Sequence, residues 1–259
     1  MRRLVLALAS ITALGLTALA GGLWFGGGIN PPPIQVDADL VLHPGAAGAL
    51  RPIGDFAFAA VSDLHFGKVK DAEAAELVRS IPSLEGAPFG DGRTLGRPQF
   101  VLTCGDNVNN GEGADAAAQY RRFKSAMDGT GLPYYYANGN HDVYGANDSI
   151  EGLRREPFAA GRAYYRFEHE GVHFLVLNFY TDTEGDTPPA ELDPEQRAWF
   201  RAALLEIGPR APIVLVFHPL PERWSWLHMP PWIAMTRDSA TFLASTIQEF
   251  RVVAILCGH

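Results

Sequence analysis

Short runs of apolar residues alternate with amphipathic stretches along most of the chain. Each run ends at glycine or polar residues, which is typical of a buried β-strand. We expect strands at 56–61, 100–103, 133–137, 163–169, 172–180, 213–217 and 252–256. Between them, apolar residues recur three or four positions apart, which is the spacing of one helix face. This pattern predicts helices at 71–80, 114–127, 194–207 and 239–250.

The connections between these elements also follow from the residues. The strands 163–169 and 172–180 are separated by Glu170-Gly171, which predicts a β-hairpin. Glycines and prolines predict a loop at 83–97, and a linker with one leading strand at 30–52. Strands that alternate with helices predict an α/β domain with a mostly mixed sheet, which we place at 53–259.

The N-terminus has the pattern of a targeting segment. Met1-Arg2-Arg3 precedes an uncharged stretch, 4–29, in which Ala18-Leu19-Ala20 offers an A-x-A cleavage site. We therefore expect a secretory signal peptide within 1–29. The apolar run continues through Leu23-Trp24-Phe25, and a bilayer needs about 20 residues, so an uncleaved signal-anchor is the alternative. Either reading places the rest of the chain in an exported, periplasmic or extracytoplasmic, or membrane-anchored location.

The composition of the chain limits the classes of molecule that we expect it to bind. The chain of 259 residues is 47% hydrophobic and 19% charged, which is ordinary for a globular protein. The formal net charge of −8 shows no excess of basic residues, so no specific nucleic-acid partner is predicted. Two cysteines, Cys104 and Cys257, are too few for a disulfide framework and lack CxxC spacing, and we expect small buried thiols.

Polar motifs with ligand chemistry follow five of the expected strands. They are Asp63-Leu64-His65, Gly105-Asp106-Asn107, Gly139-Asn140-His141-Asp142, His218 and Gly258-His259. Carboxylates, imidazoles and an amide oxygen together suit a pair of divalent transition metals. The first and last motifs are weak alone, and a lone histidine such as His218 is more often structural. The four-residue motif at 139–142 is the most specific.

The order of these motifs resembles that of the calcineurin-like metallophosphoesterase family. The resemblance implies a sandwich of two mixed β-sheets flanked by helices, with two metals (Mn, Fe or Zn) at the strand ends. It also implies hydrolysis of a small-molecule phosphate ester, in which a metal-bound hydroxide attacks phosphorus. The metal ligands that it implies are Asp63 and His65 on the first ion, Asp106 as the bridge, and Asn140, His218 and His259 on the second.

Two catalytic residues are expected beside these ligands. His141 stays off the metals and either donates a proton to the leaving oxygen or binds a phosphate oxygen. Asp142 is expected to hydrogen-bond His141 and to orient its ring. Purple acid phosphatases carry a tyrosine three residues after the bridging aspartate, whereas this chain has Asn109 there. A ferric-tyrosinate enzyme is therefore disfavoured.

The family's final motif continues with one further residue and another ligand histidine, whereas this sequence ends at His259. We expect a truncated gene product or fragment in which the first metal binds weakly. The alternative is a natural chain whose first metal has only Asp63, His65 and Asp106 as protein ligands.

Phosphodiester substrates are favoured over monoesters only by analogy, because the motifs handle the phosphorus centre that both share. A different class, a non-catalytic metal- or ligand-binding homologue at the membrane, stays open. The stretch 219–232, which contains Trp224, Trp226, His228 and Trp232, is either a substrate wall or an apolar loop. The acidic stretch 181–186 is expected to be a solvated loop.

Overall fold

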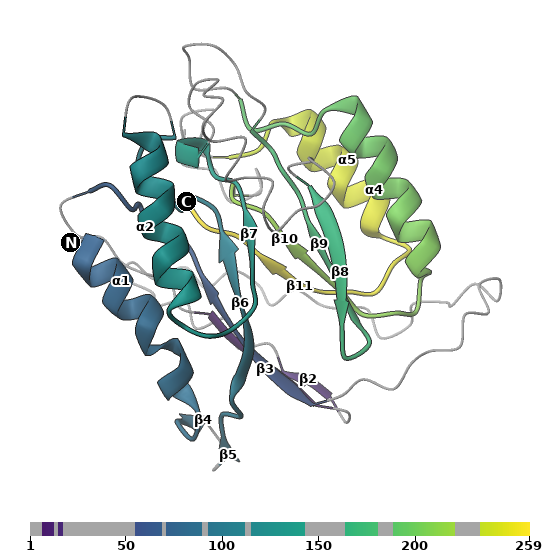
Figure 1. The fold of residues 1–259 in the computed structure, drawn as a ribbon. Helices are drawn as coiled ribbons and strands as arrows, with labels where there is room; N and C mark the ends of the chain where they lie inside the picture. Colours follow the sequence, from purple (N-terminus) through teal and green to yellow (C-terminus); the bar gives the residue numbers. More distant parts are fainter. Residues whose placement is uncertain are drawn as a thin grey trace, which may run out of the picture.

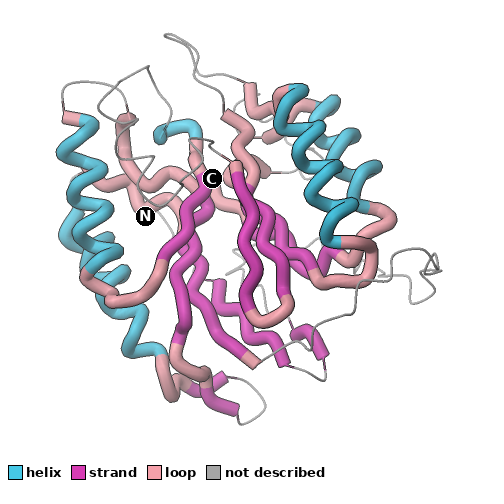
Figure 2. The backbone as a smooth tube through the Cα atoms, turned by 45° about the vertical axis from the view of Figure 1, so that its right-hand side comes forward, coloured by secondary structure: helices cyan, strands magenta, loops and turns pink. Residues whose placement is uncertain are grey.

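Two β-sheets lie face to face, and helices cover the outer face of each one (Figures 1 and 2). The computed structural model describes residues 7–12, 15–17, 55–68, 71–89, 93–111, 115–142, 164–180, 189–220 and 234–259. The strands are β1 (Ala7–Thr12), β2 (Gly15–Thr17), β3 (Phe56–Val61), β4 (Pro88–Phe89), β5 (Arg93–Thr94), β6 (Pro98–Cys104), β7 (Tyr134–Ala137), β8 (Tyr165–His169), β9 (Val172–Val176), β10 (Ile213–Val216) and β11 (Val252–Leu256). The helices are α1 (Asp71–Ser80), η1 (Ile81–Leu84), α2 (Ala116–Asp128), η2 (Asn140–Asp142), α4 (Pro194–Ile207) and α5 (Arg237–Ile247).

Both large sheets are mixed. The first has the order β2-β1-β3-β6-β7, in which β3, β6 and β7 are parallel and β1 is antiparallel to β3. The second has the order β11-β10-β9-β8, with β10 parallel to both neighbours and a β8–β9 hairpin at one edge. The predicted sandwich of two mixed sheets flanked by helices is confirmed.

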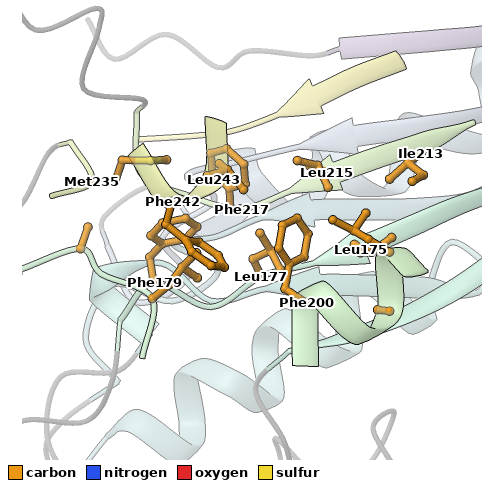
Figure 3. Packing of buried hydrophobic residues seen from close by; sticks show 14 of the residues in the cluster. Leu175, Leu177, Phe179, Phe200, Ile213, Leu215, Phe217, Met235, Phe242 and Leu243 are labelled. Carbon is orange, nitrogen blue, oxygen red and sulfur yellow. The ribbon is translucent and has the colours of Figure 1, made fainter. Parts of the chain in front are cut away.

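The two sheets and the two groups of helices that cover them form four layers, and a buried apolar cluster lies between each pair of neighbouring layers. Strand β3 sends Ala59 and Val61 toward α1 and α2, and Phe58 toward the second sheet. Strand β10 likewise sends Val214 into the layer between the sheets and Leu215 toward α4 and α5 (Figure 3). Because these strands are covered on both faces, they appear in the sequence as continuous apolar runs rather than as alternating ones.

Local signals fix the helix ends. Asp193 caps α4 by accepting a hydrogen bond from the Gln196 amide at 2.8 Å, and Pro194 fills the first turn, where no amide hydrogen is needed. The helix ends at Gly208, whose φ of 83° is left-handed.

The two-residue connection of the β8–β9 hairpin is also left-handed, at Glu170 (φ 49°) and Gly171 (φ 79°).

Most predicted elements agree with the structure. The helices at 71–80 and 194–207 and the strands at 56–61 and 252–256 have the predicted bounds. The prediction of a plain loop at 83–97 is wrong in part, because β4 and β5 form a two-stranded sheet there. Each of these strands has only two residues, too few to show a periodic pattern.

Several predictions lie wholly or mostly outside the described residues. These are the linker at 30–52, the domain start at 53, the acidic stretch 181–186, and 221–233 with Trp224, Trp226, His228 and Trp232. Within the expected targeting segment, the structure describes β1 and β2, and its role stays a prediction. None of the helices in the described ranges has the length and apolar character that crossing a bilayer requires.

Candidate metal centre

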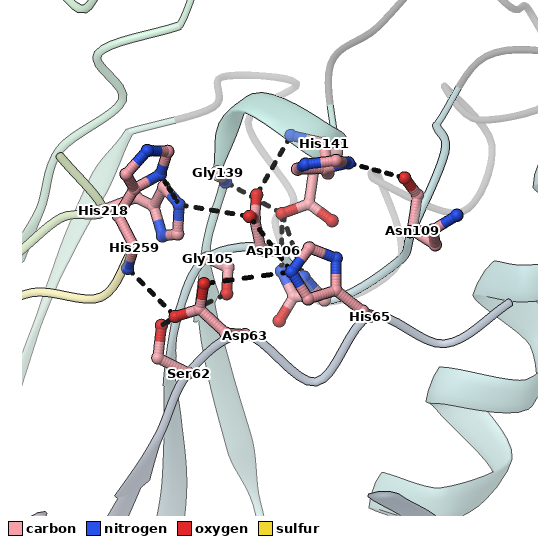
Figure 4. Close-up of polar contacts among 12 residues, drawn as sticks. Ser62, Asp63, His65, Gly105, Asp106, Asn109, Gly139, His141, His218 and His259 are labelled. Carbon is pink, nitrogen blue, oxygen red and sulfur yellow. Dashed lines mark hydrogen bonds and ion pairs between the residues drawn. The ribbon is translucent and has the colours of Figure 1, made fainter. Parts of the chain in front are cut away.

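The predicted ligand residues converge at the carboxyl ends of parallel strands from both sheets (Figure 4). Each motif directly follows its strand: Asp63 and His65 follow β3, Asp106 follows β6, Asn140, His141 and Asp142 form η2 after β7, His218 follows β10, and His259 follows β11. Parallel strands end at the same edge of a sheet, and face-to-face packing brings the two edges together. The site therefore straddles the sandwich rather than belonging to one sheet.

Asp106 is the central group, and it is only 2% exposed. Its Oδ2 lies 3.5 Å from Nε2 of His65 and 3.4 Å from Nε2 of His218. Its Oδ1 accepts a hydrogen bond from the backbone amide of His141 at 3.0 Å. Burial favours the neutral acid, but the charge and hydrogen bond of His218 outweigh it and hold the pKa of Asp106 well below its usual range.

Two sets of ligand atoms share this carboxylate. One set is His65, Asp106 and His141, and the other is Asp106, His218 and His259. Within each set, the ligand atoms all lie within 4.8 Å of one another. A carboxylate common to two such sets has the geometry of a bridge between two cations.

The contacts of His218 fit a cation at its Nε2. Its Nδ1 lies 2.7 Å from the Cys104 carbonyl oxygen, which can only accept, so Nδ1 carries the hydrogen. The neutral ring then presents a lone pair at Nε2, where Nδ1 of His259 lies at 2.8 Å and the Asp106 carboxylate lies nearby. Without a cation only a proton satisfies this cluster, and although burial opposes it, Asp106 raises the pKa of His218 to about 9. A divalent metal would satisfy the same acceptors.

His65 also fits a metal ligand. Burial lowers its pKa to about 4, although Asp106 opposes the shift, so the ring is neutral near pH 7, the form that binds metals. Its Nδ1 is buried and has no hydrogen-bond partner among the residues that the structure describes. The nitrogen that faces Asp106 and Asp63 is Nε2, which is therefore the candidate ligand atom.

Asp63, which the sequence predicted as a ligand of the first metal, lies farther from the centre of the site than that role suggested. Its Oδ1 lies 3.9 Å from Nε2 of His65, and it belongs to neither set of ligand atoms found among the described residues. Its Oδ2 accepts hydrogen bonds from Ser62 Oγ at 2.7 Å and from the His259 amide at 2.9 Å. His141, which was predicted to stay off the metals, takes the third place in the first set.

Asp142 differs most from its predicted role. Its buried carboxylate accepts hydrogen bonds from the amides of Gly139 (2.8 Å), Val108 (3.0 Å) and Asn107 (3.2 Å), and from Asn107 Nδ2 (3.1 Å). It was expected to orient His141, but Nδ1 of that ring lies 2.6 Å from the carbonyl oxygen of Asn109. Asp142 thus joins the loop after β6 to the loop after β7. Burial and the neighbouring Asp106 raise its pKa to about 6.

Asn140, the predicted amide ligand, is 2% exposed within η2. The same short turn holds His141, whose amide binds Asp106. The structure therefore brings Asn140 to the predicted side of the site, and its role as a ligand stays a prediction.

The backbone at this site is unusual. Five non-glycine residues among those described have a positive φ, and four of them are candidate ligands: Asp63 (58°), His65 (49°), Asp106 (53°) and His259 (77°). Left-handed backbone is uncommon for such residues and costs roughly 1–3 kcal/mol each. The surrounding hydrogen bonds and strand pairing must hold these conformations in place.

The motif glycines allow close approach. A Cβ on Gly139 would overlap the Asp106 carboxylate, and one on Gly105 would overlap the His218 ring. A Cβ on Gly258 would overlap Ser62 Oγ. These positions need glycine because site atoms occupy the space of a side chain.

The sequence did not point to several supporting groups. They are the Ser62 hydroxyl, the Asn107 and Gln119 side chains, and the backbone carbonyls of Cys104 and Asn109. Asn107 belongs to the motif at 105–107 but was given no role of its own, and Ser62 directly precedes Asp63, which could have singled it out. Nothing in the sequence marks a carbonyl oxygen or a glutamine inside a helix. Both cysteines are free thiols; Cys104 is buried, as predicted, and Cys257 is partly buried.

The family model for calcineurin-like phosphoesterases matches residues 56–259, which contain the whole candidate metal centre. The chain belongs to this family. A crystal structure of a dimetal phosphatase from Danio rerio is similar in fold, with a TM-score of 0.56 and 13% sequence identity over 79% of this chain and 81% of that one. Comparison with curated proteins gives no match. Family membership supports metal-dependent hydrolysis of phosphate esters and a dinuclear site for divalent metals.

Proposed function

We propose that this calcineurin-like phosphoesterase prefers phosphodiesters to monoesters and acts on a small-molecule substrate. The observation that carries the hydrolytic function is the Asp106 carboxylate, shared by two sets of ligand atoms. The preference for diesters rests on analogy alone, because the ligand geometry acts on phosphorus in both substrate classes.

We assign two roles to the site residues, metal binding and proton transfer. Asp63, His65, Asp106, Asn140, His218 and His259 would hold two divalent ions, for which Mn, Fe and Zn all suit the mixed nitrogen and oxygen donors. When bound, such ions lower the pKa of a water nucleophile and neutralise phosphate charge. His141 stands beside them with the hydrogen of Nδ1 held by the Asn109 carbonyl, so its Nε2, once it has taken up a second proton, is the atom that can transfer that proton to the leaving oxygen.

Hydrolysis of bis(p-nitrophenyl) phosphate and p-nitrophenyl phosphate by the Mn-loaded protein tests the proposal. We expect turnover of both substrates with a higher kcat/KM for the diester, a loss of roughly 100-fold or more in His141→Ala, and no measurable turnover in Asp106→Asn. The matched control is Lys124→Ala, an exposed change on α2, which should retain wild-type rates.

Three results would count against the proposal or part of it. Two bound metal equivalents without turnover of either ester would exclude the hydrolytic function. One equivalent without turnover would instead favour the non-catalytic binding homologue. A higher kcat/KM for the monoester would reverse only the substrate preference.

An exported or membrane-anchored location is part of the same proposal. Its support is the uncharged stretch 4–29 behind two arginines, with an A-x-A site at 18–20. Mass spectrometry of the N-terminus after expression in cells tests it. A chain that begins after Ala20 indicates cleavage, an intact N-terminus in the membrane fraction indicates an anchor, and an intact chain in the soluble cytoplasmic fraction contradicts both.

A further inference from the structure

The contact between His141 and Asn109 sets which ring nitrogen can serve the reaction. Nδ1 of His141 lies 2.6 Å from the Asn109 carbonyl oxygen (Figure 4). A carbonyl oxygen only accepts, so Nδ1 carries a hydrogen and Nε2 is left for the site. The ring also stands nearly perpendicular to that of His65, with an interplanar angle of 83° and centroids 4.7 Å apart. The position of the Asn109 carbonyl therefore controls both the tautomer of His141 and the direction in which its Nε2 points.

Gln119 of helix α2 holds the peptide units beside that carbonyl. Its Oε1 accepts hydrogen bonds from the backbone amides of Asn109 at 3.1 Å and Asn110 at 3.0 Å. Its Nε2 donates to Asp115 at 3.0 Å, which fixes the orientation of the side-chain amide. The Asn109 amide also donates to the Phe66 carbonyl at 2.8 Å, so the loop has one anchor that is independent of Gln119.

The surroundings of Gln119 leave its side chain little freedom. It is 2% exposed, although glutamine is usually found at the surface. A Cβ on Gly67 would overlap its amide group, and the φ of Gly67 is 110°, a conformation that favours glycine. A polar side chain buried this deeply and hydrogen-bonded at both ends serves to fix the groups that it contacts.

We propose that Gln119 is a positioning residue for His141, acting through the loop that carries the Asn109 carbonyl. This inference rests on the proposed function, because it assumes that His141 donates a proton to the leaving oxygen. Gln119 does not touch substrate, metal or the reacting atoms. It acts by holding the acceptor that keeps hydrogen on Nδ1 and directs Nε2 into the site.

The test uses the leaving group, because a proton donor matters most when the leaving oxygen is strongly basic. Gln119→Met keeps the length of the side chain but removes the acceptor. We expect kcat for a phenyl phosphodiester to fall by roughly 10-fold or more, and kcat for the p-nitrophenyl phosphodiester by less than about 3-fold. KM and the metal content should change little. Loss of fold or of metal alone would lower both rates equally.

Two further variants provide the controls. Ser125→Ala changes an exposed residue on the same helix and should leave both rates at wild-type values. The double variant Asp115→Asn with Gln119→Glu restores an acceptor for the two loop amides and reverses the side-chain hydrogen bond. It should recover the phenyl ester rate.

The tautomer of His141 gives a readout that does not depend on activity. Two-bond ¹⁵N–¹H correlations of the metal-free protein should show hydrogen on Nδ1 in the wild type and a mixture of tautomers in Gln119→Met. Identical spectra, or equal losses for both leaving groups, would overturn the positioning role. If the wild type hydrolyses neither ester while the tautomers differ as expected, the proposed function fails and the positioning of His141 stands.

Discussion

Nδ1 of His218, which follows β10, donates its hydrogen to the carbonyl oxygen of Cys104, the last residue of β6, at 2.7 Å. The two residues belong to different sheets. A ligand carried by the second sheet is therefore oriented by the backbone of the first. Such supporting contacts fix the tautomer of a metal-binding histidine. The site can therefore form only when the two sheets pack against each other in this relative position.

Replacement of His218 should remove one metal site. His218→Phe deletes the nitrogen that faces Asp106 and His259 but keeps a ring in the buried space. We expect the variant to bind one Mn equivalent fewer than the wild type, and to lose roughly 100-fold or more in kcat. Elemental analysis after dialysis measures the metal. His173→Gln, which alters a histidine paired with Glu168 away from the site, should retain the wild-type metal content, and two equivalents in His218→Phe would contradict the assignment.

Gly139→Ala should damage both the fold and the site. The new methyl group would overlap the Asp106 carboxylate and the Asp106 amide. We expect a loss of about 1–3 kcal/mol in the free energy of unfolding, together with weaker metal binding. Urea denaturation measures the first and calorimetric titration with Mn the second. The matched control is Gly96→Ala, where nothing lies within 4 Å of the new methyl group. Equal stability of the two variants would show that the loops adjust freely.

Asp142→Ala should destabilise the protein because its carboxylate is a buried hydrogen-bond acceptor. The change would leave four buried donors, on Gly139, Val108 and Asn107, without their acceptor. We expect a loss of at least about 2 kcal/mol in the free energy of unfolding, measured in urea on the metal-free protein. Asp128→Ala, which removes an exposed partner of Lys124, should cost less than about 1 kcal/mol. Similar values for the two variants would refute the structural role of Asp142.

His169 should make stability depend on pH. Its Nε2 lies 2.7 Å from Oε1 of Gln99, and its ring packs edge-on against Phe56 and Phe100. Burial lowers the pKa of His169, and the charge of Glu170 opposes this shift. A lowered folded-state pKa means that the unfolded chain binds more protons as the pH falls below about 6.5, so stability falls in that range.

The His169→Gln variant isolates this contribution. Between pH 7.5 and 5.5, the metal-free variant should lose less free energy of unfolding than the metal-free wild type. The comparison cancels the titration of other histidines, which both proteins share. Equal losses in the two proteins would show that the pKa of His169 is the same in the folded and unfolded chains.

The sequence predicted the layered fold because its main elements are locally marked. Strands such as β3 and β10 are covered on both faces, so they stand out as continuous apolar runs. Helix α4 is bounded by a capping aspartate and a glycine. By contrast, β4 and β5 depend on mutual pairing, and no local pattern reveals two-residue strands.

The site was predictable in its ligands but not in its supports. Motif residues follow strand ends, so topology alone brings them together. The hydrogen bonds of Asp142 to the amides of Asn107 and Val108 were not predicted, because its position next to His141 suggested only a contact with that ring. Gln119 and the Asn109 carbonyl act through the path of a loop, which no residue pattern encodes.

The left-handed backbone of four candidate ligands links metal occupancy to folding. The left-handed conformations of Asp63, His65, Asp106 and His259 carry a conformational cost that the rest of the fold must offset. The free energy of metal binding to these residues would add to the stability of the folded state. A chelator should consequently lower the melting temperature as well as the rate, and the two losses should share one dependence on free metal concentration.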